Sequence, residues 1–151
     1  MRALIISLIL ICSTCPSQAF AENDSVRFAA MDIYLHSVEP IAAWQFELND
    51  RHGLMKVVGV ERGESPAYTR APYYDREAVR LDEADRIVVA DYSLADVDEL
   101  PSGRTRIATL HLILGGSDDT DFNLLLITAT TFDGHATDAS ASFEIQTGSE
   151  Q

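Results

Sequence analysis

Apolar and polar residues alternate along much of the chain in short runs, as they do in β-strands with one buried face. The clearest run covers residues 41–48, in which Ala42, Trp44, Phe46 and Leu48 fall on one side. Because successive side chains of a strand point to opposite faces, this run predicts a strand whose aromatic side lies in the core. Trp44 is therefore predicted to be a core residue.

Similar runs recur at short intervals and are separated by residues that favour turns. They cover 26–36, 54–61, 86–92, 105–114, 123–132 and 140–146. Within 105–114, one face holds Ala108, Leu110, Leu112 and Leu114, and the other holds Ile107, Thr109, His111 and Ile113. Short strands at this spacing, without a long amphipathic helix, predict an antiparallel all-β fold, namely a β-sandwich of eight or nine strands.

Two connections differ in their turn chemistry. Residues 49–53 (NDRHG) include Asn, Asp and Gly, which form local hydrogen bonds and accept positive φ angles. This turn predicts a hairpin between 41–48 and 54–61. The longer connection, 62–85, is expected to be irregular because its prolines lack the amide hydrogen that a central strand donates.

Residues 1–21 have the composition of a cleavable signal peptide. A positive residue precedes an apolar run at 3–11, and the segment ends in the letters AFA just before Glu22. Small residues at the third and first positions before the cut match an export cleavage site. The alternative is a membrane anchor. A membrane-spanning helix requires about 20 apolar residues, and polar residues interrupt this run before it reaches that length. We expect a mature single domain of residues 22–151, secreted to the periplasm or the cell exterior and not attached to the membrane.

Both cysteines, Cys12 and Cys15, lie inside the predicted signal peptide. Neither is preceded, three positions earlier, by the Leu that a lipoprotein site requires, so no lipid anchor is expected. The mature domain then has no thiol. This excludes a disulfide framework, a Cys-ligated zinc and a Cys nucleophile.

The mature domain is strongly acidic. It holds all 24 acidic residues against 10 of the 11 Lys and Arg, a net charge of −14 by subtraction. A domain of this size buries enough surface to need no disulfide. Because no cluster of Lys and Arg is available to contact phosphates, nucleic acid is not an expected partner. The acidity favours solubility, or a partner that carries positive charge or metal.

Two acidic loops are candidates for calcium, which prefers oxygen ligands. Asp118, Asp119 and Asp121 cluster in the first, and Asp133 and Asp138 lie in the second. Their spacing does not follow the EF-hand loop. We expect solvated turns and no cofactor, with a metal site at Asp118, Asp119 and Asp121 as the weaker alternative.

The sequence lacks the common catalytic signatures. The histidines lie on different predicted elements (His36, His52, His111 and His135), and no G-x-S-x-G or H-E-x-x-H motif is present. A pair of carboxylates at catalytic separation stays open as an alternative, because a sequence gives no distances. The chain is expected to be non-catalytic.

Tyrosines are the main binding candidates. Tyr68, Tyr73 and Tyr74 lie in the long connection, and Tyr92 ends a predicted strand. Exposed Tyr rings stack on sugars or anchor protein interfaces, whereas rings that fold inward would cover one end of the sandwich. The sequence leaves both interpretations open.

In its order of segments the chain resembles the cohesin-like modules of extracellular scaffold proteins, which share a β-sandwich with a family of carbohydrate-binding modules. The resemblance rests on 41–60 (IAAWQFELNDRHGLMKVVGV), 86–93 (RIVVADYS) and 100–114 (LPSGRTRIATLHLIL). It extends over about residues 26–146. The turn after Leu48 lacks the aromatic residue that family members more often carry before the Asp. The resemblance implies a jelly-roll or cohesin-like sandwich and a non-catalytic binding domain.

The expected function is therefore protein binding in an extracellular assembly, through one face of the sandwich. A dockerin-like partner follows from the resemblance alone. The alternative is a carbohydrate-binding module that stacks polysaccharide on Tyr68, Tyr73, Tyr74 or Tyr92, and a hydrolase with an acid pair is a third possibility. Protein binding and carbohydrate binding are distinguished by the tyrosine rings, which a carbohydrate-binding module would hold coplanar on an exposed face.

Overall fold

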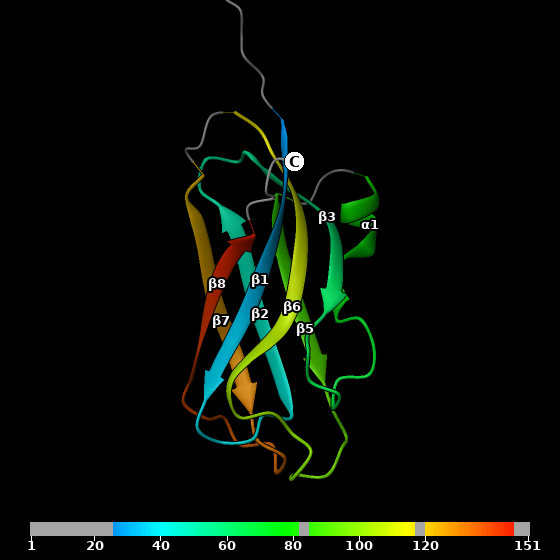
Figure 1. Cartoon of the computed structure of the whole chain (residues 1–151), viewed down its shortest axis with the longest axis vertical. Coiled ribbons are helices and arrows are strands. Elements are labelled where there is room, and N and C mark those ends of the chain that lie inside the picture. The colour runs from blue at the N-terminus through cyan, green and yellow to red at the C-terminus, as the bar shows by residue number, and fades with distance from the viewer. Residues whose placement is uncertain (1–25, 82–84, 117–119, 147–151) are drawn as a thin grey trace, which may run out of the picture.

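The chain folds as a sandwich of two antiparallel four-stranded sheets (Figure 1). The computed structural model describes residues 26–81, 85–116 and 120–146, so the predicted signal peptide lies outside the described residues. One sheet has the strand order β3-β6-β1-β8 and the other has the order β4-β5-β2-β7. The strands are β1 (Arg27–Ser37), β2 (Ala43–Asp50), β3 (Met55–Arg62), β4 (Tyr73–Tyr74), β5 (Arg86–Tyr92), β6 (Gly103–Leu114), β7 (Phe122–Thr130) and β8 (Ala139–Gln146). The predicted all-β sandwich is confirmed, with eight strands.

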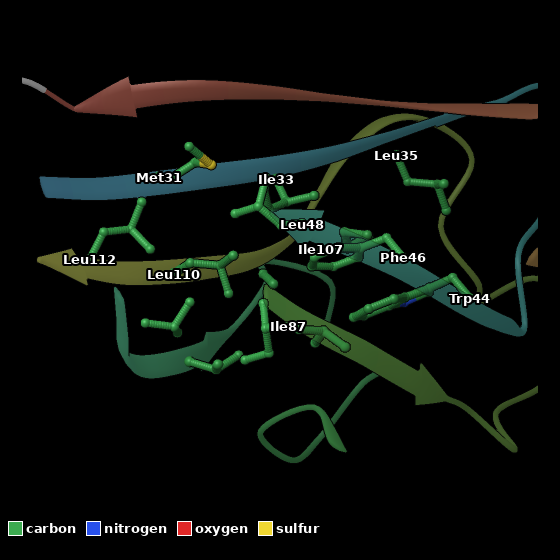
Figure 2. Close-up of a cluster of buried hydrophobic side chains, with 14 of the residues drawn as sticks. Met31, Ile33, Leu35, Trp44, Phe46, Leu48, Ile87, Ile107, Leu110 and Leu112 are labelled. Atoms are coloured by element: carbon green, nitrogen blue, oxygen red, sulfur yellow. The ribbon is translucent and has the colours of Figure 1, made fainter. Parts of the chain in front are cut away.

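Alternate residues of the facing strands fill the space between the sheets (Figure 2). Its fully buried side chains include Met31, Ile33, Trp44, Phe46, Leu48, Ile107, Leu110 and Leu112. Trp44 is 1% exposed, which confirms it as a core residue. Its ring stacks on Phe46 at a centroid distance of 5.6 Å and meets the edge of Tyr68 at 6.0 Å.

The predicted hairpin between 41–48 and 54–61 is wrong. Strand β2 pairs with β5 on one edge and with β7 on the other, so it has no free edge for β3. Strand β3 pairs with β6 in the other sheet, and the turn between β2 and β3 crosses from one sheet to the other. The turn chemistry is nevertheless as predicted, because the Asp50 carboxylate accepts hydrogen bonds from the amides of Leu54 (2.7 Å) and Asp121 (2.9 Å), and Gly53 has a φ of +67°.

The 62–85 connection is more ordered than its prolines predict. It contains strand β4, which pairs with the C-terminal half of β5, and helix α1 (Arg76–Arg80). Asp75 starts this helix, since its carboxylate accepts the amides of Glu77 and Ala78 at 3.0 Å each. Helix α1 lies beside β3 (Figure 1). Among the described segments, none is a helix with the length and apolar character that crossing a bilayer demands.

A β-bulge changes the burial of strand β6. Ile33 faces Ala108 and Tyr34 faces Arg106, so Ile107 is the extra residue at this point. Ile107 and Ala108 are both buried, although simple alternation places them on opposite faces. The remaining inward residues of β6, from Leu110 onward, follow the predicted alternation.

Candidate binding face

The outer surface of the β4-β5-β2-β7 sheet carries exposed aromatic and aliphatic side chains, and we call it the aromatic face. Tyr73 lies opposite Ala90, and Tyr92 lies two residues farther along β5 on the same side. On β7, Leu125 projects from the same side, opposite Glu47 of β2. Tyr73, Tyr92 and Leu125 have exposed fractions of 50%, 46% and 53%. Apolar groups left this open on one sheet face are candidates for contact with a partner.

Tyr73 and Tyr92 form a stacked pair with Arg70 beside them. The two ring centroids lie 6.0 Å apart, and the ring planes differ by 6°. The guanidinium carbon of Arg70 lies 5.6 Å from the centroid of Tyr73 and 5.8 Å from that of Tyr92. A guanidinium at this distance is attracted to the negative face of an aromatic ring. The sequence placed Arg70 near Tyr73 in the chain but gave no sign that it contacts Tyr92.

Hydrogen bonding within this cluster changes how its members titrate. The Arg70 guanidinium, through a hydrogen bond, lowers the pKa of the Tyr92 hydroxyl. The hydrogen bond between the two tyrosines raises the pKa of Tyr73. The hydrogen bond between Arg70 and Tyr92 raises the pKa of Arg70, which therefore stays charged. The cluster presents one fixed positive charge and two polar ring tips to solvent.

Two anchors hold the loop that carries Arg70. The Tyr68 hydroxyl donates to the carbonyl of Ile41 at 2.7 Å, and the Ser93 hydroxyl donates to the carbonyl of Ala67 at 2.7 Å. Tyr68 and Ser93 are both buried. Because these contacts precede Arg70 by a few residues, the loop is fixed where it reaches the aromatic face.

The other two tyrosine candidates do not lie on this face. Tyr68 is 4% exposed and packs against Trp44, so it cannot stack on a ligand at the surface. Burial raises the pKa of Tyr68. Tyr74 pairs with Val89 and packs partly against the core, and the Arg76 guanidinium lies 5.6 Å from its ring. These two rings follow the inward alternative that the sequence left open.

A small recess of about 210 Å³ adjoins the aromatic cluster between the Arg70 loop and the end of β5. Arg70, Asp91 and Tyr92 line it. Asp91 is 5% exposed; one carboxylate oxygen accepts the amide of Tyr92 at 2.8 Å, and the other has no hydrogen-bond partner among the described residues. Burial raises the pKa of Asp91. A buried carboxylate with an unused acceptor is destabilising in its charged form.

The outer surface of the β3-β6-β1-β8 sheet is polar, and we call it the polar face. Asp32 of β1 is 6% exposed and accepts hydrogen bonds from Thr109 (2.5 Å) and from the Gln146 amide (2.6 Å). The Arg106 guanidinium donates to Thr109 at 2.6 Å and lies 3.6 Å from the Asp32 carboxylate. Within this cluster, each donor side chain has an acceptor and the buried carboxylate has donors.

Further polar groups of this face are also paired with one another, while the ring of Phe28 in β1 is 77% exposed on the same side. Arg104 donates to Glu144 at 2.7 Å and covers the ring of Tyr34, with 3.4 Å between the guanidinium carbon and the ring centroid. His36 and Ser142 share a hydrogen bond of 2.7 Å. A Ser–His pair is one part of a nucleophilic site, which also needs a group that orients the histidine. No charged partner of His36 is found among the described residues.

The acidic loops lie at opposite ends of the sandwich. Asp121 precedes β7, whereas Asp133 and Asp138 follow it, and a nine-residue strand spans about 30 Å. The two acidic loops therefore do not adjoin. Asp121 pairs with Arg51 at 3.2 Å, and Asp118 and Asp119 lie outside the described residues. In residues 26–81, 85–116 and 120–146, no three His, Cys, Asp or Glu side chains are grouped as a metal site requires.

Comparison with family models, with curated proteins and with solved structures finds no match for this chain.

Proposed function

We propose that this chain is an exported, non-catalytic module that binds another protein through the aromatic face. The proposal rests on one contrast: Tyr73, Tyr92 and Arg70 are open to solvent, whereas the polar groups of the opposite face are bonded to one another. Tyrosine and arginine are enriched among the few residues that dominate protein–protein binding energy. The resemblance to cohesin-like modules points the same way and implies a dockerin-like partner.

The geometry of the cluster suits binding. Because the two rings already stack and Arg70 lies beside both, little side-chain freedom remains to be lost when a partner covers them. The ring faces offer apolar area, and the Arg70 guanidinium offers donors to a carbonyl or carboxylate of the partner. Leu125 lies across β2 from the cluster and adds a second apolar group near the other edge of the sheet, with the Glu47–Arg86 ion pair beside it.

Polysaccharide binding is the second candidate, because the rings of Tyr73 and Tyr92 are parallel and half exposed. A sugar stacks on an open ring face. Here the rings stack on one another, so each covers part of the surface that a sugar would use. Protein binding is therefore placed first.

The two candidates separate in a capture experiment with three immobilised forms of residues 22–151. These are the wild type, the double variant Tyr73→Ala/Tyr92→Ala, and Tyr34→Ala, which removes a tyrosine from the polar face. We expect the wild type and Tyr34→Ala to retain the same exported protein, and the double variant to lose it. A protein that all three retain equally would contradict the site. Binding of the wild type to a glycan array, lost in the double variant, would favour the carbohydrate function.

Export is tested separately. The motif before Glu22 predicts that the exported chain begins at Glu22. N-terminal sequencing of protein from the periplasm or the medium checks this directly. Exported material that still began at Met1 would contradict the predicted cleavage.

A further inference from the structure

A second surface lies at the end of the sandwich where β1, β5 and β7 finish (Figure 1). Three recesses of about 540, 550 and 550 Å³ follow one another there. Val38 and Asp138 line both the first and the second, while Glu39 and Ala136 line both the second and the third. Because neighbouring recesses share walls, they form one elongated depression, which we call the end groove.

The end groove is formed by three connections that are tied to one another. The Thr137 hydroxyl donates to the Glu39 carboxylate, which joins the β7–β8 connection to the β1–β2 connection. The amide of Ile41 donates to the carbonyl of Pro101 at 3.0 Å, which joins the β1–β2 connection to the β5–β6 connection. Ile41 itself is buried. The groove is therefore shaped by the fold before any partner arrives.

Exposed apolar side chains line or border the groove. Val38 is 95% exposed and separates the first two recesses. Val97 and Phe132 face the third recess, next to Pro40, and are more than half exposed. This apolar surface lies at the end of the molecule, apart from the aromatic face.

The same connections are uniformly acidic. Residues 38–40, 94–102 and 131–139 contain Glu39, Asp96, Asp98, Glu99, Asp133 and Asp138, and no Lys or Arg. Of these six, Asp133 has a charged neighbour among the described residues when the His135 ring, at 3.5 Å, is protonated. Like charges gathered around a concave surface attract an oppositely charged partner. Arg104 also lines the first recess, where its guanidinium is paired with Glu144. The second and third recesses combine apolar walls with a negative rim.

We propose that the end groove binds an extended polypeptide segment that carries Lys or Arg on both sides of an apolar side chain. The apolar side chain would cover Val97 and Phe132, and the flanking cations would lie near Glu39, Asp133 and Asp138. The shape requires an extended segment, because the three recesses form a row and not one deep pocket. This site is independent of the aromatic face.

Fluorescence anisotropy tests the proposal with a labelled ten-residue peptide that has four lysines around a Leu–Phe pair. A peptide in which glutamates replace the lysines is the ligand control. Two groove variants are compared, Val38→Ser/Phe132→Ser and Glu39→Gln/Asp133→Asn/Asp138→Asn. Their controls remove the same number of exposed apolar or acidic side chains elsewhere: Val58→Ser/Leu81→Ser, and Glu61→Gln/Glu64→Gln/Glu77→Gln. A thermal melt of each variant confirms that it is folded.

We expect the lysine peptide to bind, and each groove variant to lose at least tenfold in affinity while the control variants change by less than twofold. Tyr73→Ala/Tyr92→Ala should leave peptide binding unchanged, so that failure here is distinct from failure of the aromatic face. The proposal is overturned if the lysine peptide does not bind at millimolar concentration, if the glutamate peptide binds equally, or if the control variants lose as much affinity.

Discussion

The two outer faces of the sandwich use their polar and aromatic side chains in opposite ways. On the polar face, Asp32 accepts hydrogen bonds from Thr109 and Gln146; Asp32 and Thr109 are buried, whereas Gln146 is exposed. On the aromatic face, Tyr73 and Tyr92 stack together but stay half exposed. Polar groups that hydrogen-bond within the protein stabilise the fold and leave few donors or acceptors for a binding partner. This contrast is the basis of our proposal that the aromatic face, and not the polar face, binds a partner.

The core beneath both faces should show the largest effect on stability. Trp44→Ala removes a side chain that is 1% exposed and contacts Phe46 and Tyr68. The free energy of unfolding should fall by about 3–5 kcal/mol, the range for deletion of a large core aromatic. Denaturant unfolding measures this. An unchanged midpoint would show that the core, which supports both faces, is wrongly placed.

On the polar face, Asp32→Ala should cost stability. The variant leaves the Thr109 hydroxyl and the Gln146 amide without their acceptor and removes the ion-pair partner of the Arg106 guanidinium. Loss of a buried charged acceptor of this kind lowers the free energy of unfolding by about 2–3 kcal/mol. Denaturant unfolding again provides the measurement. A change below about 0.5 kcal/mol, which is ordinary for a surface site, would remove the contrast between the faces.

Asp91 lies inside the sandwich behind the aromatic cluster. Replacing its carboxylate by a neutral amide should stabilise the fold at neutral pH. Burial raises its pKa, so its stabilising contribution is full below the unfolded pKa and is lost as the pH rises through the folded pKa. Asp91→Asn should therefore raise the free energy of unfolding by about 1 kcal/mol at pH 7 and change it little at pH 3. Melting temperatures of both proteins across this pH range check the sign. A variant that is less stable at pH 7 would show that the charged carboxylate is well paired.

The smallest expected effect is the order in which the two exposed tyrosines ionise. The pKa of Tyr92 is lowered by Arg70, and the pKa of Tyr73 is raised by its bond to Tyr92, so Tyr92 should lose its proton first. Because the pKa of Tyr92 is lower in the folded state, its ionised form stabilises the fold. This stabilisation is absent at neutral pH and grows as the pH rises through the folded pKa. Tyr34, Tyr68 and Tyr74 also absorb, so ultraviolet titration of Tyr73→Phe is compared with that of Tyr73→Phe/Tyr92→Phe, and the difference follows Tyr92. Arg70→Gln in the Tyr73→Phe background should raise the pKa of Tyr92. An unchanged titration would show that Arg70 does not contact the ring.

Alternation along the chain predicts strands well but does not predict which strands pair. The run that contains Trp44 was correctly predicted because a buried face leaves a period of two. The turn after it was also predicted from its Asn, Asp and Gly. Whether β2 then folds back on β3 or crosses to the other sheet depends on β5 and β7, which come later in the chain. Turn chemistry within 49–53 cannot carry that information.

Register, which the sequence leaves open, decides which tyrosines lie on the aromatic face. Tyr73 and Tyr74 are neighbours in the chain, and the short strand β4 turns one toward solvent and the other toward the core. Only the pairing of Tyr73 with Ala90 decides which is which. Tyr68 turns inward because its hydroxyl finds the carbonyl of Ile41, a contact between distant segments. Of the four tyrosines that local composition singled out, two lie exposed on the aromatic face and two turn inward.

The central claim is that a partner protein binds the aromatic face and not the polar face. The most direct test is isothermal titration calorimetry of the captured partner with the wild type, Tyr73→Ala, Tyr92→Ala and Tyr34→Ala. If the claim holds, Tyr73→Ala or Tyr92→Ala weakens binding by about 30-fold or more, the effect of losing an energetically dominant contact of about 2 kcal/mol. Tyr34→Ala then leaves the dissociation constant within about twofold of the wild type. Weakened binding in Tyr34→Ala, with Tyr73→Ala and Tyr92→Ala unchanged, would contradict the claim.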